Sequence, residues 1–474
     1  MKTSSYTLPV AVLGALLPLT TNAAPDNSLK VSAQQRDQLS LTLYNQNLGL
    51  VRETRQLPIL KASQSVLIED VSAQLQPETL QLKNAGQIIE QNHNTDLLSY
   101  TRLLQHYLGK SLQLAEQNPA TGTEQVSTVR LMALNGNQAL IERNSQIESL
   151  PLNNQRRFIF PALPDNLTLS PSISFRSQGT DQANKAEISY LTGGLSWQMN
   201  YVLELNKAGD SASLNGMATL HNNTGSSFPQ ARISLLAGQV NQPHSPVMQR
   251  KAERVMMSAM AMDASTASAP SRQQLQDFHL YSLPQPVDLQ NNQQKQVSLF
   301  SSSKIGVERI HQLNLPVYAQ PQPERKQINP SLQLKFANSG DNGLGEPMPA
   351  GTIRVFSPDK SNQSQFIGGS RIGNQARNND VYVQLGTAFD VTVDQQQTRF
   401  EKTFDGVKSD LRLVLKNSAK RPAQLKLSTR FQKRWQISNN SHPYETNGNA
   451  AVWQLTLPAS SETEVTFQVQ QFNK

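Results

Sequence analysis

The chain has 474 residues, no cysteine and a formal net charge of +8 at pH 7. The absence of cysteine excludes disulfides, thiol nucleophiles and thiolate metal sites. The length allows a hydrophobic core without such cross-links and suggests about three domains. The charge suits an anionic partner, but the basic residues are scattered as pairs such as Lys420-Arg421. We therefore expect a solvated surface and no nucleic-acid partner.

The first residues have the pattern of a secretory signal peptide. Lys2 gives a positive start, residues 8–19 are apolar but too few to span a bilayer, and Thr21-Asn22-Ala23 supplies small residues at a cleavage site. We expect cleavage after Ala23 and a periplasmic or extracellular location. Without a lipobox cysteine no lipoprotein is expected, and no later apolar run is long enough to predict a transmembrane helix.

The next region is predicted to consist of β-strands. Residues 41–51 (LTLYNQNLGLV) alternate apolar and polar side chains and predict one strand. Shorter strands are predicted over Ser65–Val71 and Glu78–Leu82, with a break at Gln76-Pro77 between them.

A helix followed by a small β-module is expected next. The apolar stripe of Asp96–Leu108 predicts the helix, with Asn94 or Thr95 as its N-cap and Gly109 just after its end. The runs that follow alternate like strands, and Asn135-Gly136-Asn137 between two of them has the pattern of a hairpin turn.

The middle of the chain continues the β pattern around one different segment. Strands separated by turns rich in Gly and Asn are predicted from Glu187 to Val240. Residues 244–275 are rich in Met, Ala and Ser instead. We interpret them as a flexible insertion or, over Arg250–Met262, as a short amphipathic helix.

The last section has the clearest alternation. Leu411, Leu413 and Leu415 are separated by polar residues, and Asn447-Gly448 is a turn signal. This spacing predicts an immunoglobulin-like sandwich. The predicted fold is mainly β, with several antiparallel sandwich-like or barrel-like modules and one short helix. The expected regions are a signal peptide (1–23), an N-terminal β region (24–92), the helix with its β-module (93–185), a central β domain (186–405) with the insertion at 244–275, and the sandwich (406–474).

A search for catalytic motifs gives no complete constellation. The run Gly194-Leu195-Ser196-Trp197 lacks the final glycine of a nucleophile elbow, and the histidines are dispersed without metal-ligand spacing. The glycine-rich run Gly368–Gly373 lacks the Lys-Ser/Thr ending of a phosphate loop and is interpreted as a hairpin or bulged turn. The sequence therefore predicts no catalytic residue, no cofactor and no metal site.

The carboxylates leave an enzymatic alternative open. Asp390 and Asp394 flank a strand-like segment, and four residues along a strand separate them by about 13 Å. That separation is too large for the carboxylate pair of a retaining glycosidase. A hydrolase would need a partner from elsewhere in the fold, such as Glu346.

Several segments resemble the bacterial domain-of-unknown-function 4139 family. The matching motifs are Tyr190–Trp197 with Tyr201, Asn223–Gly238, His279–Tyr281, Pro349–Val355 and Gly386–Asp390. The family is related to the C-terminal part of mucoidy-inhibitor-like proteins, whose long coiled coil has no heptad counterpart here. The resemblance implies a β-rich secreted protein and assigns no activity or catalytic residue.

Three matched residues are candidates for ligand binding. Trp197 and Tyr201 are four apart on a predicted strand and therefore share a face, where they either pack a sheet core or line a sugar-binding platform. Asp390 is interpreted as a turn residue that hydrogen-bonds backbone amides, or as a ligand-binding carboxylate.

Three functional hypotheses follow from these observations. The first is a secreted non-enzymatic protein that binds or scaffolds a cell-envelope component, either a polysaccharide or a protein. The second is an envelope-polymer hydrolase that uses carboxylates such as Asp390 and Glu346. The third is a subunit that assembles through β-strand pairing, with residues 244–275 ordering on a partner.

Overall fold

The computed structural model describes residues 28–94, 98–118, 121–152, 156–162, 164, 167, 169–242, 271–275 and 278–473. Strands dominate these residues, and α1 (Tyr100–His106) is the one α-helix among them, so the predicted mainly β fold with one short helix is confirmed. Three short 3₁₀ turns are η1 (Ala33–Gln35), η2 (Pro77–Thr79) and η3 (Gly340–Asn342). No helix in these ranges has the length and apolar character needed to cross a bilayer.

The chain divides into two compact units. The described residues within 28–35, 56–69 and 83–186 form unit 1, and those within 36–55, 70–82 and 187–473 form unit 2. The predicted signal peptide and most of the predicted insertion lie outside the described residues. The last five residues of that insertion, 271–275, form a paired strand.

Unit 1 contains two sheets. In spatial order, the first has β1 (Leu29–Val31), β4 (Ser65–Glu69), β12 (Ser172–Ser177) and β6 (Ile88–Asn94), and the second has β10 (Gln146–Pro151), β9 (Gln138–Arg143), β8 (Glu124–Asn135), β7 (Ser111–Gln117) and β11 (Arg156–Ile159). Leu104 and Tyr107 at the end of α1 join Leu131 and Phe158 of the second sheet in one core. Strands β8 and β9 pair as far as Asn135 and Gln138, so the predicted hairpin is confirmed.

The helix of unit 1 begins later than predicted. Ser99 is its N-cap, and the Ser99 hydroxyl accepts a hydrogen bond from the backbone N–H of Arg102 at 3.2 Å. The prediction of Asn94 as the cap is wrong because Asn94 pairs with Ser172 in the first sheet. Thr95, the other predicted cap, lies outside the described residues. Gly109 has a φ of +76° beyond the helix end, a conformation that suits glycine.

The first sheet of unit 2 has eight strands. Its order is β17 (Ser271–Leu275), β18 (Phe278–Ser282), β16 (Phe228–Ala237), β2 (Arg36–Tyr44), β3 (Gly49–Leu57), β13 (Asn184–Thr192) and β5 (Gln81–Lys83), with β19 (Val287–Leu289) also paired to β16. The prediction of one strand over residues 41–51 is wrong, because the chain reverses after Tyr44. Tyr44 donates its N–H to the Leu48 carbonyl at 3.1 Å, which closes the turn between β2 and β3.

The second sheet of unit 2 has five strands. Its order is β20 (Gln293–Gly306), β15 (Ser211–Asn222), β14 (Leu195–Leu205), β24 (Gly351–Pro358) and β25 (Ser364–Ile372). The register of β24 against β25 shifts beside Gly368, which has a φ of +135°. The glycine-rich run therefore lies in the β24–β25 hairpin and carries a bulge within the strand rather than a bulged turn, and an irregular strand position of this kind favours glycine.

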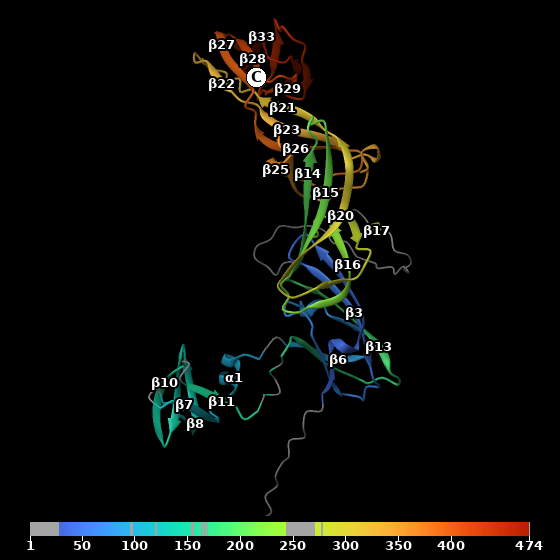
Figure 1. Cartoon of the computed structure of the whole chain (residues 1–474), viewed down its shortest axis with the longest axis vertical. Coiled ribbons are helices and arrows are strands. Elements are labelled where there is room, and N and C mark those ends of the chain that lie inside the picture. The colour runs from blue at the N-terminus through green and yellow to red at the C-terminus, as the bar shows by residue number, and fades with distance from the viewer. Residues whose placement is uncertain are drawn as a thin grey trace, which may run out of the picture. The chain divides into compact units, whose positions relative to one another are not determined.

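The C-terminal part of unit 2 is a two-sheet sandwich (Figure 1). One sheet has β26 (Asp380–Thr387), β23 (Ser331–Ala337), β21 (Glu308–Asn314), β29 (Ala423–Arg430), β32 (Ala450–Leu457) and β31 (Glu445–Asn447), and the other has β22 (Lys326–Ile328), β27 (Val391–Thr403), β28 (Gly406–Asn417), β33 (Ser461–Phe472) and β30 (Trp435–Ser438). Their shared core includes Leu313, Val393, Leu413, Trp453 and Phe467. Strands before Gly406 therefore contribute to the sandwich, and the boundary predicted there falls inside the β27–β28 hairpin.

Candidate functional site

Trp197 and Tyr201 lie on one face of β14, and their side chains are buried. Trp197 is 1 % exposed and donates its Nε1–H to the Leu236 carbonyl at 3.1 Å. Tyr201 is 0 % exposed and donates its hydroxyl hydrogen to the Pro349 carbonyl at 2.9 Å. Burial raises the pKa of the Tyr201 hydroxyl far above its usual value. Both rings belong to the core, so they do not form the solvent-facing sugar platform that the sequence left open.

Asp390, the third candidate, lies in a different environment. Its side chain is exposed just before β27, and it lines a groove of about 350 Å³, which we call the Asp390 groove. The walls come from segments that are far apart in sequence: the turn at residues 208–210, the start of β21, residues 388–391 and the loop at 417–424. All four segments belong to unit 2.

Two arginines supply hydrogen-bond donors to the Asp390 groove. Arg309 and Arg421 both line it. The buried Nε of Arg309 has no hydrogen-bond partner among the described residues. Gly209 lies directly against this guanidinium, because a Cβ added at Gly209 would be 2.8 Å from Arg309 Nη2. The groove therefore contains a positioned cation with unused hydrogen-bonding capacity.

His311 adds an acceptor to the same groove. Its Nδ1 lies 3.1 Å from the Gln424 carbonyl oxygen, and since that oxygen only accepts, Nδ1 carries the proton. Burial lowers the pKa of His311, and the hydrogen bond to Gln424 and, to a smaller extent, the Asp390 carboxylate oppose this effect. The neutral ring then offers Nε2 as an acceptor.

Phe389 is the most prominent apolar feature beside the groove. Its side chain is 91 % exposed, although the neighbouring Ala388 is buried. The backbone is held on both sides, because Ala388 N–H donates to the Pro330 carbonyl at 2.8 Å and Ser418 N–H donates to the Asp390 carbonyl at 2.8 Å. The fold therefore fixes this backbone while leaving a large aromatic ring in solvent.

The second predicted carboxylate does not join Asp390. Glu346 is exposed in the loop before β24, where its backbone carbonyl accepts from Asn338 Nδ2 at 2.8 Å, and it does not line the Asp390 groove. The carboxylates that do line the groove are Asp210 and Glu308. The structure therefore does not bring together the Asp390–Glu346 pair.

Asp394 is engaged in the sandwich itself. Its side chain is 12 % exposed, with Oδ2 at 2.7 Å from Arg325 Nη2 and 3.9 Å from Lys416 Nζ. The carboxylate therefore joins segments of the sandwich rather than facing a ligand groove.

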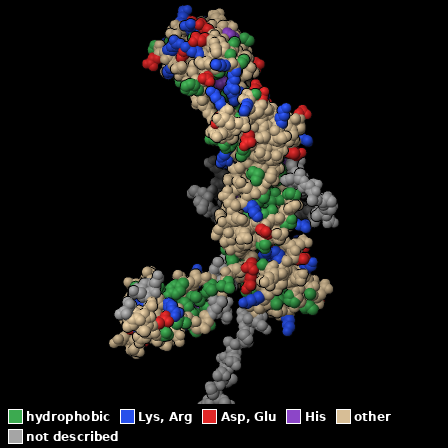
Figure 2. All heavy atoms as spheres, viewed as in Figure 1, with side chains coloured by type: hydrophobic (Ala, Val, Ile, Leu, Met, Phe, Trp, Pro, Cys, Tyr) green, Lys and Arg blue, Asp and Glu red, His purple; other side chains and the backbone are tan. Residues whose placement is uncertain are grey.

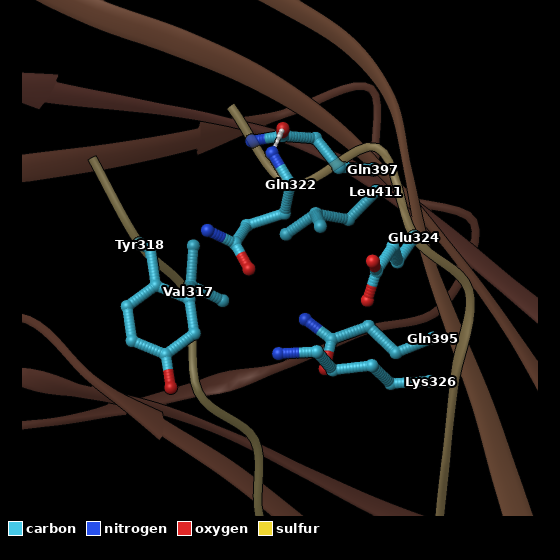
Figure 3. Close-up of a pocket in the computed structure, with 8 residues that line it drawn as sticks. All are labelled: Val317, Tyr318, Gln322, Glu324, Lys326, Gln395, Gln397 and Leu411. Carbon is cyan, nitrogen blue, oxygen red and sulfur yellow. Dashed lines mark hydrogen bonds between the residues drawn. The ribbon is translucent and has the colours of Figure 1, made fainter. Parts of the chain in front are cut away.

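A second hollow in the sandwich is too small for a polymer. It lies between residues 317–326 and strands β27 and β28 and holds about 20 Å³ (Figure 3). At one edge of the hollow, Gln322 donates its backbone N–H to Gln397 Oε1 at 2.6 Å. Tyr318 lies at another edge (Figure 3). This volume accommodates about one water molecule.

Two more hollows, of about 730 Å³ and about 460 Å³, lie among the described residues of unit 1, and Tyr100, Arg156 and Arg157 line the larger one. The structure has no group of three or more metal-ligating side chains within the ranges given above. On the visible face, Lys and Arg side chains are scattered among acidic ones rather than gathered in a tract (Figure 2).

The sequence did not identify most of the groove. The sequence pattern did not single out Glu308, Arg309 or His311. Arg421 belongs to a pair that was interpreted as solvated surface. Only the exposed Phe389-Asp390 dipeptide gave a signal, as part of a family motif.

A comparison with protein families matches residues 186–471 to the family described as "Domain of unknown function (DUF4139)". The match covers more than half of the chain and includes every segment that lines the Asp390 groove. It confirms the resemblance found in the sequence. A comparison with curated proteins gives no match.

Proposed function

We propose that this chain, which belongs to the DUF4139 family, is an exported, non-enzymatic protein that binds a cell-envelope polysaccharide in the Asp390 groove. The observation that carries the proposal is the combination of an exposed aromatic ring with unpaired hydrogen-bonding groups in one concave surface. Phe389 supplies the ring, Arg309 and Arg421 the donors, and Asp390 and His311 the acceptors.

The chemistry of polysaccharides fits these groups. A sugar ring has an apolar face that packs against an aromatic side chain, and hydroxyls that both donate and accept hydrogen bonds. The groove offers donors and acceptors within one surface, and its charges are of both signs. Concave surfaces with a few convergent polar groups are the usual form of such sites.

The two alternatives receive less support. The hydrolase that pairs Asp390 with Glu346 lacks its second carboxylate, because Glu346 does not line the groove. Assembly through strand pairing would use a long outer strand such as β20, but the register of β20 shifts twice against β15. Bulges of this kind twist an edge and protect it from pairing.

Export is supported by the signal-like pattern that ends at Ala23. Fractionation of cells that produce the protein, followed by mass determination of its N-terminus, tests this part. We expect a periplasmic or secreted form that begins at Ala24. An unprocessed chain in the cytosol would contradict export.

Binding is tested with purified protein and polysaccharide isolated from the envelope. Arg421→Gln is expected to weaken binding about tenfold, the typical effect of losing a hydrogen bond from a charged group. Phe389→Ser removes the stacking ring and is expected to weaken binding by roughly fivefold. The matched control is Phe404→Ser, because Phe404 is also exposed but does not line the groove.

If the wild-type protein and the three variants bind the polysaccharide with equal affinity, the Asp390 groove is not the binding site. The same samples are assayed for new reducing ends. Their release by the wild-type protein, and its loss in Asp390→Asn, would replace the binding function by hydrolysis.

A further inference from the structure

We propose that the tip of the β27–β28 hairpin inserts into the headgroup layer of an anionic lipid bilayer. The turn consists of Phe404 and Asp405, between the paired residues Thr403 and Gly406. Phe404 is completely exposed, at 105 % of the reference value for its side chain. This surface is separate from the Asp390 groove, and the inference does not depend on the polysaccharide proposal.

The turn that carries Phe404 is held firmly. The Asp405 carboxylate accepts from the Thr403 hydroxyl at 2.9 Å and from Gln470 Nε2 at 3.2 Å. The Asp405 carbonyl accepts from the N–H of Asn473 at 2.8 Å. Gly406 packs so closely against the Gln471 carbonyl oxygen that a Cβ would overlap it. The aromatic ring therefore projects from an ordered turn rather than from a loose loop.

Four basic residues lie on the segments that adjoin this turn. Lys402 lies opposite Val407 and Lys408 opposite Glu401 in the hairpin register, so the two lysines lie on opposite faces of the hairpin. Lys433 and Arg434 lie on the neighbouring connection before β30, and both are exposed.

These four cations are available to an anionic partner. Among the described residues, no acidic side chain forms an ion pair with Lys402, Lys408, Lys433 or Arg434. Two acids lie at this end of the hairpin: the Asp405 carboxylate is hydrogen-bonded to Thr403 and Gln470, and Glu401 is paired with Arg399 at 2.9 Å. Arg434 lies over the ring of Phe472, 4.7 Å from its centroid, and so remains at this end of the sheet.

An aromatic tip flanked by unpaired cations matches the chemistry of a lipid interface. The ring reaches the boundary between headgroups and acyl chains, while lysine and arginine side chains extend to the lipid phosphates. Basic residues near an anionic bilayer each contribute a similar attraction, which salt weakens. A pocket on a protein partner would accommodate the ring but would not explain cations on both faces of the hairpin.

The test is sedimentation of the purified protein with vesicles of phosphatidylglycerol and phosphatidylcholine in equal parts, and with vesicles of phosphatidylcholine alone. We expect binding to the anionic vesicles only. Phe404→Ser is expected to lower the partition coefficient about tenfold. Replacing Lys402 and Lys408 by Gln is expected to lower it by about fivefold for each lysine.

Phe389→Ser is the control, because it removes another exposed phenylalanine and should leave vesicle binding unchanged. Circular dichroism checks that each variant is folded. Absence of wild-type binding to anionic vesicles, or equal binding by Phe404→Ser, would overturn the proposal. So would capture of an envelope protein that depends on Phe404 while vesicle binding does not.

Discussion

At the scale of single residues, burial separates the core members of the family motifs from the solvent-facing ones. Trp197 and Tyr201 use their polar atoms on backbone carbonyls inside unit 2, whereas Phe389 and Asp390 face solvent. The same motif set therefore contains core residues and surface residues, and only the structure distinguishes them.

Trp197→Ala should destabilise unit 2 without changing polysaccharide affinity. Removing a buried tryptophan is expected to cost about 3–5 kcal/mol in the free energy of unfolding. Denaturant unfolding measures the loss, and the binding assay is repeated under conditions where the variant is folded. A specific loss of affinity in a folded Trp197→Ala protein would restore the platform interpretation.

His311 should make stability depend on pH. Burial holds its pKa below that of a free histidine. Between these two pKa values the unfolded chain binds more protons than the folded chain, so stability falls as the pH is lowered. His311→Asn keeps a donor for Gln424 and cannot titrate. Its unfolding free energy should fall less than that of the wild-type protein between about pH 7.5 and about pH 5.5, and an equal fall would contradict the assignment.

At the scale of elements, a close contact between strands explains why a glycine occupies position 351 in the motif Pro349–Val355. Gly351 begins β24, beside β14, and a Cβ added there would overlap the Met199 carbonyl oxygen. Because that atom belongs to the backbone of the adjacent strand, the sheet cannot yield locally.

Gly351→Ala is therefore expected to destabilise the protein by about 1–3 kcal/mol. Gly373→Ala is the matched control, since a Cβ at Gly373 meets no atom within 4 Å. Chemical denaturation of the two variants gives the comparison. Equal stability of Gly351→Ala and Gly373→Ala would show that the close approach is relieved at no cost.

The alternation of apolar and polar side chains predicted that strands would form. It did not predict where the chain reverses between strands or which strands share a sheet. Leu41 and Leu43 have the spacing of a strand, yet the reversal at residues 45–48 depends on a hydrogen bond that the alternation does not encode. Ser99 and Asn94 are both good cap residues, and tertiary pairing of Asn94 decides between them. The groove was beyond prediction, because Arg309, His311 and Arg421 approach Asp390 only through the packing of distant segments.

At the scale of the whole molecule, two of the hydrophobic clusters each lie within a single unit. The core formed by α1 and strands β7 to β11 contains residues of unit 1 alone, and the sandwich core contains residues of unit 2 alone. All three tryptophans, Trp197, Trp435 and Trp453, belong to unit 2. Tryptophan fluorescence therefore reports the folding of unit 2.

Leu131→Ala should shift the circular dichroism transition of thermal unfolding without shifting the tryptophan fluorescence transition. Leu131 is buried in the core of unit 1, and its truncation is expected to cost about 2–5 kcal/mol there. The part of the circular dichroism transition that comes from this core should move to lower temperature, while the fluorescence transition should not move. A parallel shift of both signals would mean that the two units unfold as one.

The proposed function is tested most directly by hydrogen exchange of the purified protein with and without envelope polysaccharide. Binding in the Asp390 groove predicts slower exchange in residues 308–311, 388–391 and 417–424, and loss of this protection in Arg421→Gln. Protection confined to other segments, or no change in these three under saturating polysaccharide, would contradict the account.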